Sequence, residues 1–186
     1  MSIVLQGSTS GSITLQEPAV SGSTVLSLPA VSGTLITTGS SGQSIPKAAL
    51  PTGSVLQVVN AQFDNPTQLN TSSTSAVSTA ITLSITPTSS TSKILVFSNT
   101  QIKNEANAVY GAVAIYRNGT TSLGWNSWFQ GVTSNNWFPV TNISYDSPAT
   151  TSSTTYTVYV KASGSSISVM WGSGSTSTIT AMEIAA

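Results

Sequence analysis

Residues 12–33 read SITLQEPAVSG and then STVLSLPAVSG, two consecutive copies of one eleven-residue unit. Seven of the eleven positions are identical between the copies, and a short fixed period indicates one structural unit laid down repeatedly. Each copy begins with an apolar and hydroxyl run that favours a strand, and its Pro-Ala-Val-Ser-Gly ending favours a turn. The repeat therefore predicts short strands separated by tight turns.

Looser copies of the unit flank this stretch at residues 2–6 and 34–39. About forty residues is near the lower limit for an independent fold, and the chain has no cysteine that could form a disulfide. Such units cannot bury their apolar residues alone, so we expect other copies of the chain to cover them in an intertwined shaft or anchor. The expected contacts between copies are Ile13, Leu15, Leu26, Leu28 and Ile36.

Charge is scarce along the whole chain. Only 5% of the 186 residues are charged, against about a quarter in typical soluble domains. The basic residues are scattered and form no patch for nucleic acid: Lys47, Lys93, Lys103, Arg117 and Lys161. With no His and no Cys, imidazole and thiolate metal sites are excluded and no cofactor is expected. Low-complexity disorder is an alternative, but the hydrophobic fraction of 39% argues against it.

Targeting and membrane segments are not expected. Residues 1–7 lack the basic and apolar stretches of a secretion signal. No apolar run approaches the roughly 20 residues that a membrane-spanning helix needs. We therefore expect no insertion into a membrane.

The chain from Ser54 onward alternates strand and turn signals, and Asn118-Gly119 is a strong hairpin signal. Nine short strands are expected, at residues 55–63, 77–86, 93–102, 108–116, 122–129, 137–145, 154–162, 167–171 and 178–184. This spacing, without a helical period, is typical of an all-β sandwich or jelly roll. We therefore divide the chain into a repeat-bearing anchor, shaft and neck at residues 1–50 and a β-sandwich (jelly-roll) head at residues 51–186.

Four segments resemble parts of a known family. They are LSLPAVSGTL at 26–35, KAALPTGSVLQVV at 47–59, DSPATTSSTTY at 146–156 and STITAMEI at 177–184. They resemble the fibre and virion-surface proteins of tailed bacteriophages, whereas residues 62–142 match only in pattern. The resemblance implies a homotrimer whose fibrous N-terminal part is fixed to tail, baseplate or capsid proteins and whose jelly-roll head projects outward. The family includes both tail fibres and capsid-bound fibres.

A cluster of aromatic residues is the best candidate for function. Trp125, Trp128, Phe129, Trp137 and Phe138 fall within fourteen residues around a polar loop at 130–136. Large aromatic residues can fill a core or a subunit interface, or they can stack on sugar rings while amide side chains bind hydroxyl groups. Strand alternation places Trp125 and Trp128 on opposite sides, so the three tryptophans cannot all share one core. The candidate contacts with a host-surface glycan are Trp128, Gln130, Ser134, Asn135, Asn136 and Trp137.

Catalysis has little support in the sequence. Without His or Cys, neither a Ser/His/Asp nor a Cys/His arrangement can form. Paired carboxylates could serve a glycosidase, but the five acidic residues lie far apart in the sequence, and we expect no enzyme. Glu183 lies in an apolar terminal strand, where it is either at an exposed edge or buried with a partner such as Lys161 or Arg117.

The function expected from the sequence is structural. We expect a homotrimeric phage fibre on the virion surface that attaches to the host, gaining avidity from three weak sites on one stalk. The alternative is a capsid decoration, cement or head-fibre protein that stabilises the shell. A depolymerising glycosidase is a third and more distant possibility.

Overall fold

Thirteen β-strands and no helix make up the part of the chain that the computed structural model describes. The described residues are 3–6, 9–15, 50–64, 68–107, 109–131, 133, 135–170 and 176–186. The chain divides into two compact units, Met1–Ser44 and Ile45–Ala186. Within the described ranges, no helix is long and apolar enough to cross a membrane.

The first unit contains one described β-hairpin. Strand β1 (Ile3–Gln6) pairs antiparallel with β2 (Ser12–Leu15), and Ile3 lies opposite Leu15. The hairpin therefore joins the N-terminal looser copy of the repeat to the start of the first full copy. The expected contacts Leu26, Leu28 and Ile36, and the shaft they would form, lie outside the described residues.

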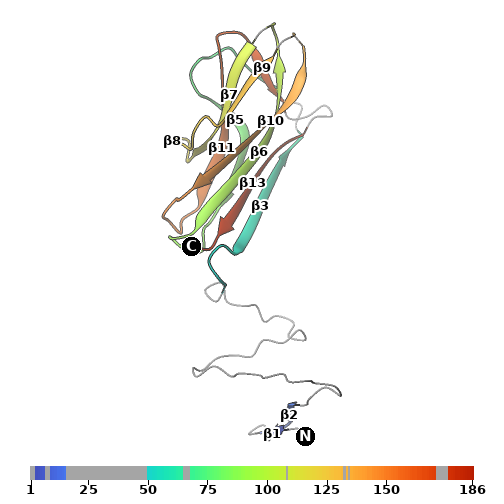
Figure 1. Ribbon diagram of the computed structural model, residues 1–186, viewed down its shortest axis with the longest axis vertical. Helices are drawn as coiled ribbons and strands as arrows, with labels where there is room; N and C mark the ends of the chain where they lie inside the picture. Colours follow the sequence, from blue (N-terminus) through green and yellow to red (C-terminus); the bar gives the residue numbers. More distant parts are fainter. Residues whose placement is uncertain are drawn as a thin grey trace, which may run out of the picture. The chain divides into compact units, whose positions relative to one another are not determined.

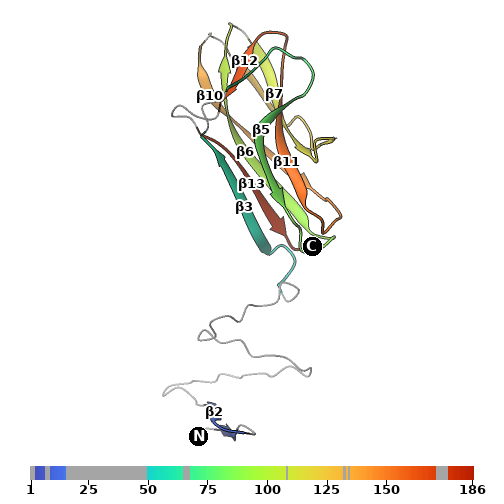
Figure 2. The ribbon, with the colours of Figure 1, turned by 180° about the vertical axis from the view of Figure 1, so that it is seen from behind.

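The second unit, the head, is a sandwich of two antiparallel sheets packed face to face (Figures 1 and 2). The β6 sheet contains β3 (Val55–Phe63), β13 (Ser177–Ile184), β6 (Lys93–Asn104), β12 (Ile167–Met170), β4 (Gln68–Thr71) and β10 (Trp137–Asp146). The β7 sheet contains β5 (Val77–Ile85), β11 (Thr154–Ala162), β7 (Val109–Arg117), β8 (Thr121–Ser122) and β9 (Ser127–Gly131). The β-sandwich expected from the sequence is confirmed.

In both sheets, two short strands follow one another end to end at one position in the strand order, and each position in this order is called a column below. Strands β13 and β12 pair with successive parts of β6, at Lys93–Asn99 and Gln101–Asn104. Strands β3 and β4 pair with β13 and β12 in turn, and β8 and β9 pair with the two ends of β7. Each sheet is therefore four columns wide. The columns run β10, β6, β13/β12, β3/β4 in one sheet and β5, β11, β7, β9/β8 in the other.

The core lies between the sheets and follows the two-residue period of the strands. Along β11, Tyr156, Val158 and Val160 are buried while the residues between them are half-buried. The inner residues of β5 and β6 are mostly isoleucine, leucine and valine, which pack well on a pleated surface. Their burial is the main favourable contribution to folding of the sandwich.

Buried polar groups tie the strands together at one edge of the sandwich. The Asp146 carboxylate accepts hydrogen bonds from Arg117 Nη1 and from Tyr156 OH, each at 2.7 Å. Burial, and then the bond to Asp146, raise the pKa of Tyr156 well above its usual value. Asn142 Nδ2 donates to Val113 O at 2.8 Å. These bonds connect β10 of one sheet with β7 and β11 of the other.

Two local predictions were wrong. The polar segment Gln68–Thr71 forms strand β4, because an edge strand needs only backbone pairing with β12 and little apolar surface. The strand expected at 122–129 is interrupted between β8 and β9, where Gly124 has a φ of 105°. Asn126 fills the interruption and donates to Ile143 O at 3.2 Å.

The hairpin turn between β7 and β8 is confirmed. Asn118 and Gly119 have φ angles of 50° and 71°, as a type I′ turn requires. Thr120 N donates to Arg117 O at 3.2 Å and closes the turn. The Asn118 side chain also accepts a hydrogen bond from Thr155 N on the neighbouring strand.

Glu183 is buried, and its partners are hydrogen-bond donors other than the cations considered from the sequence. Its side chain is 0% exposed. Thr88 donates to Oε1 from its backbone nitrogen and from its hydroxyl, each at 2.7 Å, and Gln57 Nε2 donates to Oε2 at 2.6 Å. Burial raises the pKa of Glu183, but the hydrogen bonds outweigh burial and the net pKa is lowered. The Ser92 hydroxyl acts in the same direction, although it makes no hydrogen bond of normal geometry.

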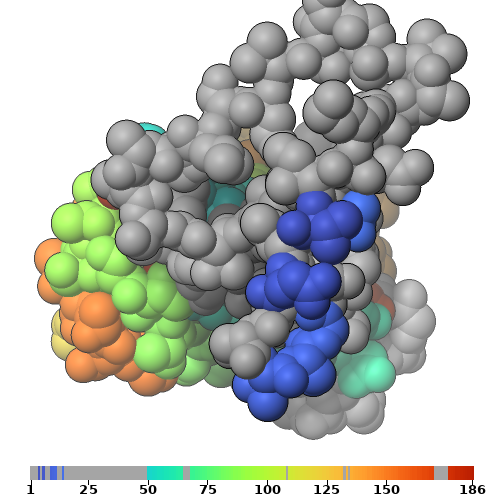
Figure 3. Space-filling view, turned by 90° about the horizontal axis from the view of Figure 1, so that it is seen from below, coloured from blue at the N-terminus to red at the C-terminus, as the bar shows by residue number. Residues whose placement is uncertain are grey.

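The chain enters and leaves the head at the same end. Gly53 N donates to Ala185 O at 2.8 Å, and Ala185 N donates to Ser54 O at 2.9 Å. Figure 3 looks onto this end, where the green segment that joins β5 to β6 lies beside the orange segment that joins β10 to β11. Lys93 Nζ donates to Ser147 Oγ at 2.9 Å and links these two segments. This end is called the neck end below.

Candidate functional site

The outer face of the β7 sheet carries a line of aromatic side chains around one lysine. Tyr159 stacks on Tyr116 with ring centroids 4.1 Å apart, and Tyr116 meets Trp125 edge to face at 6.2 Å. The ammonium of Lys161 lies 4.3 Å from the ring centroid of Trp125 and 4.8 Å from that of Trp128. Beyond Trp128 lies Tyr110, which shares a hollow with it. The set Tyr110, Tyr116, Trp125, Trp128, Tyr159 and Lys161 is called the aromatic strip.

Strand pairing explains how the strip forms. Ala112 on β7 lies opposite Trp128 on one side and Lys161 on the other. Ala112 and Ala114 point to the outer face by alternation and are nevertheless fully buried, because the larger side chains on both sides cover them. The small side chains of Ala112 and Ala114 therefore leave room for Lys161 to extend over β7 to the indole rings.

The end of the strip near Trp128 is open to solvent. The Trp128 side chain is 68% exposed and Tyr110 is 49% exposed. Between them lies a hollow of about 50 Å³, lined also by Gly111, Lys161, Ala162 and Ser163. Gln130 Nε2 donates to Tyr110 OH at 3.0 Å, so an amide lies next to one of the residues that line the hollow. Flat aromatic faces beside polar groups suit the apolar and hydroxyl faces of a sugar ring.

Lys161, like Lys93, has no acidic partner among the described residues, but it contacts aromatic rings. Among the described residues, Lys103 pairs with Glu105 at 3.0 Å and Arg117 pairs with Asp146 at 2.7 Å. For Lys161, the contacts within the described residues are the two indole rings. A cation over an aromatic face is attracted by about 0.5–2 kcal/mol, which holds the ammonium in place without neutralising it.

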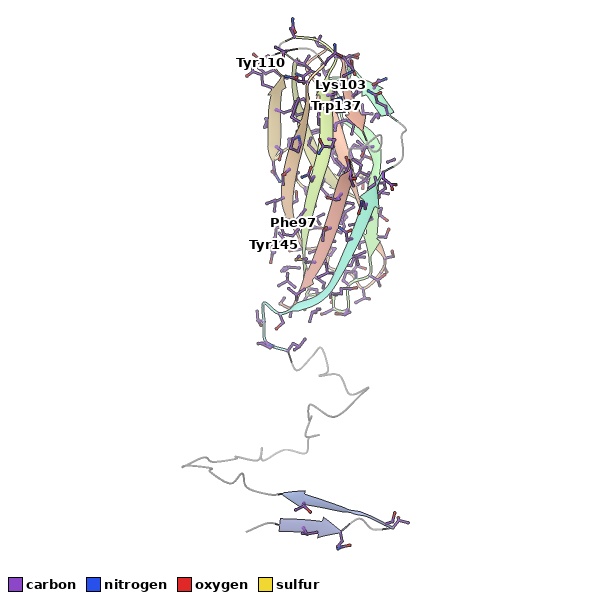
Figure 4. The ribbon with its side chains drawn as sticks, turned by 90° about the vertical axis from the view of Figure 1, so that its right-hand side faces the viewer. Phe97, Lys103, Tyr110, Trp137 and Tyr145 are labelled. Atoms are coloured by element: carbon purple, nitrogen blue, oxygen red, sulfur yellow. The ribbon has the colours of Figure 1, made fainter. Side chains whose placement is uncertain are left out.

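Of the candidate contact residues named from the sequence, two lie at the aromatic strip. Trp128 belongs to the strip and Gln130 lies beside it, and both point outward from β9. Trp137 belongs to β10 of the other sheet, is 40% exposed and lies 5.7 Å from Lys103 Nζ. Figure 4 shows Trp137 and Lys103 together toward the end of the head opposite the neck end. Ser134 lies outside the described residues.

The loop that was expected to form the contact is fixed to the sandwich by its backbone. Asn135 N donates to Asn104 O at 2.7 Å, and Asn104 N donates to Asn136 O at 3.2 Å. Asn104 is fully buried, and its side chain donates to Thr133 O at 3.1 Å. Asn136 Nδ2 donates to Thr133 Oγ1 at 2.7 Å. Asn135 and Asn136 therefore help to shape the loop itself.

The prediction that Trp125 and Trp128 face opposite sides was wrong. Both indole rings contact the same ammonium. The reason is the interruption at residues 123–126, which breaks the strand alternation before β9 begins at Ser127. Four members of the strip were missed: Tyr110, Tyr116, Tyr159 and Lys161. Alternation within 154–162 nevertheless placed Tyr159 and Lys161 opposite the buried Tyr156, Val158 and Val160.

The outer face of the β6 sheet is different in character. One row across its four columns consists of Tyr145, Leu95, Met182 and Val58, which are paired neighbour to neighbour. The adjacent pair Ile143 and Phe97 extends the row. All six side chains are exposed or half-buried. These six residues are called the apolar belt, and Figure 4 shows Phe97 and Tyr145 in the half of the head nearer the neck end.

A second hollow of about 260 Å³ lies at the neck end. Leu50, Leu56, the turn residues Thr88, Ser89, Thr91 and Ser92, and the C-terminal Ala185 and Ala186 line it. No charged side chain lines this hollow, and four of its lining residues, Thr88, Ser89, Thr91 and Ser92, carry hydroxyl groups. The described ranges contain no cluster of three or more His, Cys, Asp or Glu that could hold a metal ion.

Comparison with known proteins gives structural neighbours only. No protein-family model matches the sequence, and no curated protein matches it. T=1 particles derived from infectious bursal virus give 15% identity over 70% of this chain and 36% of that chain, with a TM-score of 0.37. The Gx strain of infectious bursal disease virus gives 13% identity over 70% and 37%, with a TM-score of 0.37. The Gt strain gives 13% identity over 98% and 46%, with a TM-score of 0.38. The chain thus spans less than half the length of these viral chains.

Proposed function

We propose that this chain is a structural protein of a phage particle whose head binds the host surface, without catalysis. The observation that carries this proposal is the aromatic strip, with Trp128 and Tyr110 exposed on a rigid sheet beside the amide of Gln130. Exposed aromatic side chains on a rigid scaffold are typical anchors of binding sites. The strip lies on strands β7, β9 and β11 and on the short link before β9, so its geometry is held by backbone pairing.

The strand order supports a jelly roll as the scaffold. Counting the columns along the chain, β3/β4 is first, β5 second, β6 third, β7 fourth, β8/β9 fifth, β10 sixth, β11 seventh and β12/β13 eighth. The sheets then have the orders 1-8-3-6 and 2-7-4-5. Eight strands arranged as two interleaved Greek keys make a jelly roll, a fold that is used in viral particles.

The apolar belt supports assembly into a homotrimer. A row of four apolar residues across the full width of an outer sheet face is unusual for a monomer, and such patches mark interaction sites. The occupant we propose is a second copy of the chain. Val55 and Val58 begin β3 just after the chain enters the head, so copies joined through residues 1–44 would bring their neck ends, and hence their belts, together.

The same belt favours a second candidate function. A decoration or cement protein would place this face against neighbouring shell subunits, and the protein would then stabilise the particle. Belt substitutions separate the two candidates. In a fragment of residues 45–186, which leaves out the joining segment, the double substitution Phe97→Ser with Ile143→Ser should convert a trimer into a monomer if copies cover the belt. It should lower the rupture temperature of the particle, without changing the mass of the free protein, if shell subunits cover it.

Adsorption of particles to host cells tests attachment. Because Trp128 is mostly exposed, Trp128→Ala should lower adsorption by about ten-fold or more while the melting temperature stays within about 2 °C. Trp137→Ala is the matched control, since Trp137 lies on the other sheet, and it should leave adsorption unchanged. Normal adsorption of Trp128→Ala particles that carry a full complement of the protein would refute attachment through the strip.

A further inference from the structure

We propose that the ligand of the aromatic strip is a glycan that carries carboxylate groups, and that Lys161 binds the carboxylate. This inference rests on the proposed attachment function and names its ligand class. It depends on three features of the strip: the charge of Lys161, the size of the hollow beside it, and the polar groups at its rim.

Lys161 supplies a positive charge that the described part of the head leaves without an acidic partner. Its ammonium lies between the indoles of Trp125 and Trp128, and the described ion pairs involve other basic residues. An ammonium has three N–H donors, and an indole face attracts the charge without accepting directed hydrogen bonds. The binding capacity that remains is for an anion, and carboxylate is the common anionic group of acidic polysaccharides.

The size of the hollow indicates how a sugar would lie. At about 50 Å³ it is far below the roughly 300 Å³ or more of sites that enclose a small molecule. A ring substituent such as a carboxylate fits this space, whereas the ring itself does not. Since Trp128 is 68% exposed, its free face can carry the ring while the substituent enters the hollow beside Lys161.

Polar groups at the rim complete the site. Ser163 Oγ accepts a hydrogen bond from Tyr110 N at 3.2 Å, which leaves its own O–H to donate. Tyr110 OH accepts from Gln130 Nε2 at 3.0 Å, so the phenol proton and the Gln130 carbonyl remain for sugar hydroxyls. These groups favour a saccharide over an acidic peptide, because they are spaced around a flat aromatic face rather than along an exposed strand edge.

Isothermal titration of the full chain with two matched probes tests the proposal. The probes are hexagalacturonic acid and its full methyl ester, which have the same rings and linkages but differ in charge. The acid should bind about ten-fold or more tightly than the ester at low salt, because hydrogen bonds to charged groups are stronger. The acid should also lose affinity as salt is raised, while the ester should not. Equal affinity for the two probes would overturn the proposal.

Variants assign the effect to Lys161. Lys161→Gln should reduce binding of the acid to the level of the ester, Lys161→Arg should restore the preference, and Trp128→Ala should weaken both probes. Unchanged acid binding in a folded Lys161→Gln protein would overturn the role of Lys161.

Particle adsorption separates this inference from the proposed function. If Trp128→Ala abolishes adsorption and Lys161→Gln does not, attachment stands and the acidic ligand is wrong. If neither variant changes adsorption, attachment through the strip is itself wrong.

Discussion

Replacing Glu183 by glutamine tests whether its buried carboxylate stabilises the head. The two oxygens accept three hydrogen bonds, two from Thr88 and one from Gln57. A glutamine can keep its oxygen toward Thr88, but its NH₂ group then faces the NH₂ group of Gln57. Gln57 cannot simply reverse its amide, because its Nε2 also donates to Thr86 O at 2.7 Å. At least one hydrogen bond is therefore lost in the variant.

The expected cost follows from these contacts. Hydrogen bonds to a charged group contribute about 1.5–3 kcal/mol each, and an unpaired buried donor costs about 1–3 kcal/mol. The remaining bonds and the relief from burying a charge offset part of this loss, so we expect about 2 kcal/mol of destabilisation at pH 7. For a domain of this size, that loss lowers the melting temperature by about 4–8 °C.

The pH dependence supplies an independent measurement. The folded pKa of Glu183 lies below its unfolded value, so its stabilisation is fully present above the unfolded pKa of about 4.3. That stabilisation is lost as pH falls through the lower folded pKa. The gap between wild type and Glu183→Gln should therefore be constant from about pH 7 to pH 5 and shrink below about pH 4.

Denaturant unfolding of both proteins from pH 7 to pH 3 measures this gap. Asp64→Asn is the control, because Asp64 is exposed just after the end of β3 and the same carboxylate-to-amide change there should cost less than about 0.5 kcal/mol. The reasoning is refuted if Glu183→Gln is as stable as wild type at pH 7. It is also refuted if the gap stays the same down to pH 3.

Two further predictions concern packing and domain independence. Gly111→Ala would place a Cβ 2.2 Å from Phe129 Cζ and 2.6 Å from Lys161 O, so it should destabilise the head by about 1–3 kcal/mol in denaturant unfolding; a change below about 0.5 kcal/mol would contradict the packing. A fragment of residues 45–186, which form one compact unit, should fold with a melting temperature within about 3 °C of the full chain, and failure of the fragment to give a cooperative transition would show that the first unit is needed.

Alternation and turn chemistry were enough to predict most of the sandwich. Strands 55–63 and 154–162 were predicted with the bounds that the structure shows, because apolar, aromatic and β-branched residues are concentrated there between clear turn signals. The polar strand Gln68–Thr71 could not be found in this way. This strand forms by pairing with β12, about a hundred residues later in the chain, and no local sequence pattern indicates that pairing.

The candidate site was only partly predictable for the same reason. Trp128 and Trp137 are nine residues apart in the sequence and were expected to flank one loop. The chain crosses from the β7 sheet to the β6 sheet between them, and each tryptophan faces outward from its own sheet. Trp128 and Trp137 are therefore close in the sequence but lie on different sheets. Lys161 and Trp128 are far apart in the sequence but become neighbours because both pair with Ala112 in the folded sheet.

The two outer faces cannot exchange their proposed roles. Covering the aromatic strip with a second copy would remove Lys161 from water without an acidic partner among the described residues of the head, and burial of an unpaired charge costs several kcal/mol. The apolar belt contains no charged side chain, so covering it incurs no such penalty and removes apolar area from water. A ligand that carries a carboxylate offsets the cost of burying Lys161, because the ammonium then gains an ionic partner when it loses contact with water. We therefore propose the belt as the face for assembly and the strip as the face for an anionic ligand.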